Sequence, residues 1–168
     1  MRIAPMVLQE ANVFINGKGY LGVTKKFKIP TLEQEVTQAK GALTTEYSAG
    51  VFKPMEVEIP LSVVDFNLYA GFGLNNLTNK IPLLIKGSIH QSGKEKQELA
   101  LAITGDFKSI EHGDYEAGAE FETTLKASVH FMSLTIDGKP LIVYDVDNMI
   151  CIVGGVDYMS KVRSILEE

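Results

Sequence analysis

Four segments of the chain alternate apolar and polar residues with a period of two, and this alternation constrains the fold more than any other feature of the sequence. The segments are residues 20–29, 83–91, 96–104 and 121–132. A period of two predicts a β-strand with one buried face and one exposed face. Several such strands with polar outer faces predict an antiparallel β-sandwich or barrel. We therefore expect a mainly β fold with one or two short flanking α-helices.

The alternation also assigns a buried face to each predicted strand. In segment 20–29 the inward residues are Leu21, Val23, Phe27 and Ile29. In segment 121–132 they are Phe121, Thr123, Leu125, Ala127, Val129 and Phe131. The polar faces carry the small residues Ala100, Ala102 and Ser128. Small residues there suit close contact with another subunit or the wall of a wide lumen, and an ordinary solvated face is the alternative.

Turn and capping signals separate these strands. Asn16-Gly17 and Asp137-Gly138 supply the positive φ that tight hairpins require, and residues 92–94 close the hairpin between 83–91 and 96–104. Ser62 is expected to cap a helix over about 63–70, with Asp65 at its capping-box position. Its expected apolar stripe is Leu61, Val64 and Leu68, and its expected end is Gly71 and Gly73.

A second helix is expected from about Tyr158 to Leu166, capped by Asp157, with Met159, Val162 and Leu166 on one face. Residues 41–58 have only weak strand character, so we expect an extended excursion there. A length of 168 residues suits one domain. The sequence therefore predicts a single domain over 1–168 with an excursion at about 41–58.

Charge and composition restrict the function. The formal net charge is -5, whereas proteins that grip nucleic acid are usually basic. Asp106, Glu111, Asp114, Glu116, Glu120 and Glu122 form an acidic run that we interpret as solvated. The N-terminus lacks an apolar run of signal length and the chain lacks 18 consecutive apolar residues. We expect a soluble protein made in a cytoplasm.

Candidate chemical motifs are weak. His90, His112 and His130 have no histidine partner at helical spacing, so no zinc helix is expected. Cys151 lies in an apolar stretch and is expected to be a small buried residue rather than a nucleophile. The sequence thus predicts no catalytic, cofactor-binding or metal-binding residue. A small-molecule-binding β-barrel stays open as an alternative function, and an enzyme as a weaker one.

Several motifs, taken in order, resemble the major tail tube proteins of contractile-tailed phages and the tube subunits of R-type bacteriocins. They lie at residues 12–17, 29–32, 113–118, 134–141, 144–150 and 155–157, followed by Arg163. The signature residues are Asn12, Gly17, Pro30, Gly113, Gly118, Asp137, Gly138, Asp145, Asn148, Gly155, Val156, Asp157 and Arg163. The stretch Gln38 to Leu43 departs from the Tyr-Arg-x-Gly-Gly-Met pattern common in that family.

The resemblance implies a structural protein with the fold of the type VI secretion tube. Such subunits form hexameric rings that stack into a hollow tube, which conducts DNA in a phage or makes a membrane-piercing channel in a bacteriocin. Implied partners are copies of the chain, sheath, baseplate and tail terminator proteins, and a tape measure protein or DNA held loosely in the lumen. The implied location is a virion tail or bacteriocin particle made in the bacterial host cytoplasm, not embedded in a membrane.

Two surfaces are expected to serve such an assembly. The candidate lumen face comprises Lys86, Ser88, His90, Glu98, Ala100 and Ala102. The candidate ring-stacking residues are Gly41, Tyr47, Val51, Phe52 and Met55. Because a basic wall would bind phosphates, we expect a net acidic or weakly charged lumen.

Overall fold

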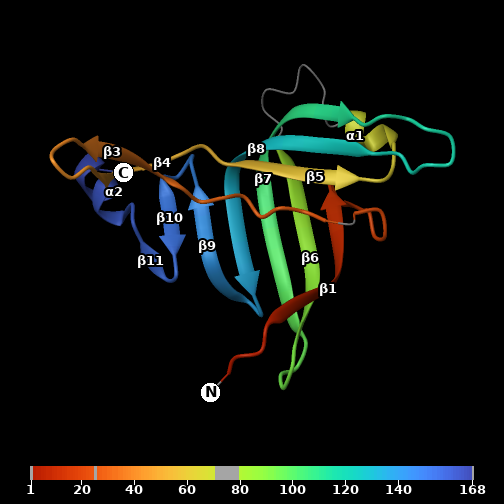
Figure 1. The fold of residues 1–168 in the computed structure, drawn as a ribbon, viewed down its shortest axis with the longest axis horizontal. Helices are drawn as coiled ribbons and strands as arrows, with labels where there is room; N and C mark the ends of the chain where they lie inside the picture. The colour runs from red at the N-terminus through yellow and green to blue at the C-terminus, as the bar shows by residue number, and fades with distance from the viewer. Residues whose placement is uncertain (1, 25, 71–79, 168) are drawn as a thin grey trace.

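A computed structural model describes residues 2–24, 26–70 and 80–167, and its main feature is an antiparallel sheet (Figure 1). Within these residues the sheet has nine strands in the order β11-β10-β9-β8-β7-β6-β1-β2, with β5 paired to β8. Strands β3 and β4 form a separate hairpin. The strands are β1 Met6–Ile15, β2 Lys18–Gly19, β3 Gln34–Ala39, β4 Thr45–Phe52, β5 Glu56–Leu61, β6 Ile81–Gln91, β7 Gln97–His112, β8 Thr123–Ile136, β9 Lys139–Asp145, β10 Ile150–Val153 and β11 Val156–Asp157. The helices are α1 Phe66–Ala70 and α2 Ser160–Leu166.

The mainly β antiparallel fold predicted from the alternation is confirmed, and the core lies on one face of the sheet. Three of the four alternating segments become β6, β7 and β8. Their inward residues pack with those of β1 and β5 in one core. Residues in this core that are less than 2% exposed include Val13, Val57, Ile59, Ile85, Leu101, Ile103, Leu125 and Met132. We call the opposite side of the sheet the outer face.

The long strands β7 and β8 bend, so that one sheet folds over its own core. Figure 1 shows β5 and the first half of β8 crossing above the remaining strands. The β7–β8 register shifts between Thr104 and Gly105, where His130 is the extra residue in β8. After this bulge the inward positions become Met132 and Leu134, and Phe131 pairs with Thr104 on the outer face. The predicted burial of Phe131 is therefore wrong.

Phe121 and segment 20–29 also differ from their predictions. Phe121 precedes β8 and is 52% exposed. Segment 20–29 is irregular. Among the described residues, its β-pairing is a single isolated bridge between Lys28 and Glu58. Gly22 adopts a φ of +82° in a turn, which breaks the pleat required by alternation. Three of the predicted inward side chains still pack against the core: Val23, Phe27 and Ile29. Leu21 is 62% exposed.

The first helix is shorter than expected. It begins at Phe66, so Ser62 is not its cap; the Ser62 backbone N–H donates to the Val23 carbonyl instead. The Asp65 carboxylate accepts hydrogen bonds from the Tyr20 hydroxyl at 2.8 Å and from Lys18 Nζ at 2.5 Å. Of the expected stripe, Leu61 and Leu68 are buried and Val64 is 45% exposed. The expected end at Gly71 and Gly73 lies outside the described residues.

The turn predictions are confirmed by backbone angles. Asn16 and Gly17 have φ of 49° and 83°, and Asp137 and Gly138 have 49° and 76°. Gly93 has a φ of 81° in the β6–β7 connection. Positive φ at both central residues is the geometry that matches the twist of a two-residue hairpin. These turns fix which strands are neighbours and therefore which side chains share the outer face.

Candidate assembly surfaces

The predicted lumen residues lie together on the outer face of β6 and β7. Lys86 pairs with Ala100, and Ser88 with Glu98, across the β6–β7 ladder. Ala102 pairs with Leu84, and His90 follows Ser88 by two positions on β6. Directly paired residues share a face of a sheet, as do residues two apart along a strand. The structure therefore brings the six residues onto one surface, and their facing a lumen stays a prediction.

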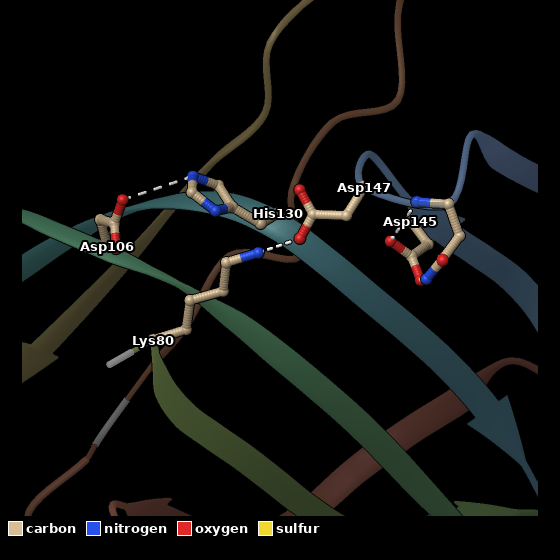
Figure 2. A network of polar contacts seen from close by, with 6 residues as sticks. Lys80, Asp106, His130, Asp145 and Asp147 are labelled. Atoms are coloured by element: carbon tan, nitrogen blue, oxygen red, sulfur yellow. Dashed lines mark hydrogen bonds and ion pairs between the residues drawn. The ribbon is translucent and has the colours of Figure 1, made fainter. Parts of the chain in front are cut away.

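Three basic residues on or beside this surface have acidic neighbours, and Figure 2 shows two of them, Lys80 near Asp147 and His130 near Asp106. His130 Nε2 lies 3.6 Å from Asp106 Oδ2, and Lys86 Nζ lies 3.7 Å from Glu98 Oε1. Lys80 forms an ion pair with Asp147, and this hydrogen bond lowers the pKa of the Asp147 carboxyl. Lys80 and Asp147 are far apart in the chain, so no local spacing could have predicted their contact. Asp145, labelled in Figure 2, accepts a hydrogen bond at 2.6 Å from Asn148 Nδ2.

The β3–β4 hairpin carries most of the predicted ring-stacking residues. Gly41 lies in its turn, Tyr47 and Val51 are 62% and 54% exposed, and Phe52 is half-buried. Every other residue of β3 and β4 is exposed as well. Met55 is the exception, because it is 4% exposed and packs in the core. Its assignment to ring stacking is therefore corrected: the subunit does not present this side chain to a neighbour.

The C-terminal segment is held by one arginine. Arg163 Nη2 donates to Asp157 Oδ2 at 2.5 Å, and its Nη1 donates to the Met149 carbonyl at 2.7 Å. Asp157 Oδ1 accepts from the Met159 backbone N–H at 3.0 Å. The N-cap residue of α2 is Met159, without a side-chain capping bond, so the prediction of Asp157 as N-cap is wrong. No residue of α2 is buried in the subunit, so its apolar face is open.

An apolar cavity opens between β1, β6 and segment 24–29. Its volume is about 740 Å³, and its lining includes Met6, Leu8, Phe27, Ile29, Ile89 and Leu99. The small-molecule-binding alternative would place its ligand here. Within the described residues no cluster of three or more His, Cys, Asp or Glu could hold a metal ion.

Comparison with known proteins decides between these functions. The family model described as phage tail tube protein FII matches residues 5–166. The chain belongs to this family. The tail tube subunit is 30% identical over 176 residues to the tail tube protein of Escherichia phage P2, and the alignment covers 95% of each protein. The match favours a structural tube subunit over the small-molecule-binding alternative.

Solved structures from contractile injection systems share the fold of the tail tube subunit. The first is from the sheath/tube terminator of an extracellular contractile injection system (PVC) in the extended state. It has 8% sequence identity and a TM-score of 0.56, and the match covers 78% of this chain and 96% of that chain. The second is from the baseplate of the anti-feeding prophage. It has 10% sequence identity and a TM-score of 0.51, and the match covers 76% of this chain and 92% of that chain. The third is from the PVC sheath-tube complex in the extended state. It has 9% sequence identity and a TM-score of 0.51, and the match covers 78% of this chain and 91% of that chain. At these identities the likeness shows the fold alone.

The signature residues of the tail tube subunit lie mainly in turns and close approaches. Gly17, Gly118, Gly138 and Gly155 adopt positive φ. A Cβ on Gly113 would lie 3.0 Å from Glu122 Cβ. Three further signature residues lie in or beside strands: Asn12 is half-buried in β1, Pro30 is buried, and Val156 is 56% exposed in β11.

Cys151 is 1% exposed, and this burial raises the pKa of its thiol, as suits a core residue. In the described part of the chain, no helix has the length and apolar character to cross a membrane.

We expect the stability of the tail tube subunit to depend on the ionisation of Asp157. The hydrogen bond from Arg163, then the one from Met159, lowers the pKa of the Asp157 carboxyl. Its stabilisation is therefore present above the unfolded pKa of about 3.9 and is lost as the pH falls through the lower folded value. Urea unfolding at a series of pH values should show Asp157→Asn less stable than wild type at neutral pH. The difference should shrink below pH ~4.

Asp114→Asn, at an exposed loop position, serves as the matched control and should unfold like wild type at neutral pH. A gap between Asp157→Asn and wild type that stays constant across the acidic range would contradict the assigned role of the Arg163–Asp157 pair.

Proposed function

We propose that six copies of the tail tube subunit close into a ring, and that rings stack into a hollow tube. The tube conducts DNA in a phage tail or forms a membrane-piercing channel in a bacteriocin-like particle. The observation that carries this proposal is the tail tube family match over residues 5–166 of a chain whose sheet has open edges. The subunit's role is architectural, without a catalytic step.

The open sheet supports ring closure. Its terminal strands, β2 and β11, are each two residues long and leave neighbouring strands without a full partner. Unpaired edges accept strands from another chain, and a head-to-tail contact that closes makes a ring. Six subunits giving about four strands each would make a barrel of about 24 strands, roughly 45 Å across at ~4.8 Å spacing and ~40° tilt. Such a barrel encloses an aqueous channel.

The two candidate surfaces then take separate roles. The outer face of β6 and β7, with Ser88, Ala100 and Ala102, is assigned to the lumen wall, where small side chains leave the channel wide. The exposed β3–β4 hairpin is assigned to contacts between rings. Isolated two-stranded sheets are marginal in water, so a hairpin without core contacts is stabilised when another subunit covers it.

The proposed partners follow from this architecture. Sheath, baseplate and tail terminator proteins surround or end the tube, and a tape measure protein or DNA occupies the lumen without tight binding. The structural likenesses to proteins from a sheath/tube terminator, a baseplate and a sheath-tube complex support this setting. The particle is a virion tail or bacteriocin assembled in the bacterial host cytoplasm.

Negative-stain electron microscopy of concentrated purified protein tests the proposal. We expect rings or tubes about 80–100 Å wide, the width of the barrel plus one sandwich layer and loops. Class averages viewed along the tube axis should have six-fold symmetry. A protein that stays monomeric at every concentration and salt condition, or rings of another symmetry, would refute the hexameric tube.

A further inference from the structure

The apolar cavity at the β1 end of the sheet is a groove that the subunit leaves uncovered. Its volume is about 740 Å³. The lining includes Ile89 and Leu99, which are buried and belong to the core. It also includes Met6 and Leu8 of β1, which remain exposed. Contiguous exposed apolar surface marks an interaction site, so this end of the core is open to a partner.

The strand beside the groove also lacks a full partner. On one side, β1 pairs with β6 along its length, from Met6 to Ile15. On the other side, among the described residues, β2 pairs only with Phe14 and Ile15. The first part of β1 therefore offers unpaired backbone groups next to apolar side chains. This combination fits a segment of another protein chain better than a small ligand.

The helix at the other end of the sheet has an apolar face without a partner. Helix α2 follows β11, the last strand at that end. Val162, Ile165 and Leu166 share one face of α2 because they are three and four positions apart, and all three are exposed. Arg163 holds the helix in place by donating a hydrogen bond to Asp157. The helix is thus fixed to the subunit with its apolar face uncovered, as a helix that docks into a groove would be.

The charges beside the groove and on α2 are complementary. Lys26 and Lys28 line the groove, and neither lysine forms an ion pair among the described residues. Glu167, the C-cap residue of α2, is exposed and likewise forms no ion pair there. The tip of the β3–β4 hairpin is the alternative occupant. It carries Lys40 near the exposed Leu43, so it would bring like charges together at the groove.

Ring closure would bring the groove and the helix together. A head-to-tail contact joins two different surfaces of the subunit, and Figure 1 shows α2 and β1 at opposite ends of the molecule. We propose that α2 of one tail tube subunit docks into the groove beside β1 of the next subunit in the same ring, with Glu167 near Lys26 and Lys28. This inference rests on the proposed function, since it requires a closed ring.

Cross-linking of assembled tubes tests the docking. The double variant Ile165→Cys/Leu8→Cys places one thiol on α2 and one at the groove, and cysteine keeps both positions apolar. A short bismaleimide should join each subunit to its neighbour. We expect a covalent ladder that ends at the hexamer on a denaturing gel. Cross-linked protein should exceed that of either single variant by about tenfold, because docking holds the two thiols close together. The native Cys151 is buried and is not expected to react.

The matched variant Leu43→Cys/Leu8→Cys tests the hairpin tip as the occupant, and we expect it to give no such ladder. A ladder from the hairpin variant in place of the α2 variant would overturn the inference. A ladder that continues beyond six subunits would do the same, because it would place α2 against another ring. So would the absence of cross-links in normally assembled tubes. Wild-type protein that forms no rings would instead refute the proposed function.

Charge reversal tests the same contact without added cysteines. Glu167→Lys should raise the protein concentration needed for assembly by about fivefold, the upper range for an exposed ion pair, as measured by sedimentation. Combining it with Lys26→Glu/Lys28→Glu should restore assembly. Glu116→Lys makes the same charge change at an exposed loop position and should assemble like wild type. Normal assembly of Glu167→Lys, or no recovery in the combined variant, would overturn the pairing of α2 with the groove.

Discussion

Gly105→Ala is expected to lower the free energy of unfolding of the free subunit by at least about 3 kcal/mol, the upper range for overpacked cores. A Cβ at this position would lie 1.7 Å from the Ser128 carbonyl oxygen and 2.9 Å from its carbon. Both are backbone atoms in the ladder between β7 and β8, so they cannot rotate away as a flexible side chain would. Relief requires the two central strands to separate where the sheet bends.

Urea unfolding followed by far-ultraviolet circular dichroism measures this effect. Gly41→Ala is the matched control, since its added Cβ would meet the Leu43 carbonyl oxygen at an ordinary 3.6 Å. We expect this control to unfold within about 0.5 kcal/mol of wild type, as exposed substitutions usually do. A Gly105→Ala subunit that matches the control would show that the close approach of β7 to β8 at Gly105 does not limit the stability of the sheet.

The bulge also shows where sequence patterns stop being informative. Alternation predicted β6 and the start of β7 because both strands keep one phase over their central residues. It misplaced Phe131 because His130 adds one residue to β8 and reverses the phase beyond it. Nothing in the spacing near His130 signals this insertion. The insertion coincides with the close approach of β7 and β8 at Gly105, which depends on tertiary packing.

Elsewhere in the molecule, too, features set by adjacent residues could be predicted from the sequence, whereas contacts between distant residues could not. The hairpin turns at Asn16 and Asp137 were predictable because positive φ is a property of two adjacent residues. The Lys80–Asp147 pair was not, since only the sheet order brings the two residues together. Segment 20–29 combined both problems: its apolar residues reach the core, and the turn at Gly22 prevents a strand. The common face of the six candidate lumen residues was predictable because it depends on alternation alone.

Removing the β3–β4 hairpin is expected to abolish tube formation while leaving the subunit folded. The excised piece must end before Met55, because Met55 and Val57 belong to the core. Gln34 pairs with Phe52, and the Lys53 N–H donates to the Glu33 carbonyl at 2.8 Å, so the two strands are already joined at the hairpin base. Replacing residues 35–51 by Asn-Gly closes this base with a two-residue turn of the favoured type.

We expect the truncated subunit to unfold within about 1 kcal/mol of wild type, because the removed residues are exposed and make few contacts whose loss would cost stability. Electron microscopy should show single rings or monomers instead of long tubes, and sedimentation velocity should show no species larger than a ring. The ring should persist because the proposed closure uses the edges of the main sheet, which the truncation leaves intact.

A point substitution tests the same contact without shortening the chain. Leu43 is 90% exposed in the hairpin turn. If a neighbouring ring covers this turn, as proposed, Leu43→Asp should weaken stacking because it buries a charge in place of an apolar side chain. Leu43→Met keeps the apolar character and should assemble normally. Long tubes formed by both the truncated subunit and Leu43→Asp would reject the hairpin as the ring-stacking element. Stacking would then have to depend on another exposed apolar surface, of which the open face of α2, with Ile165 at 70% exposure, is the next to test.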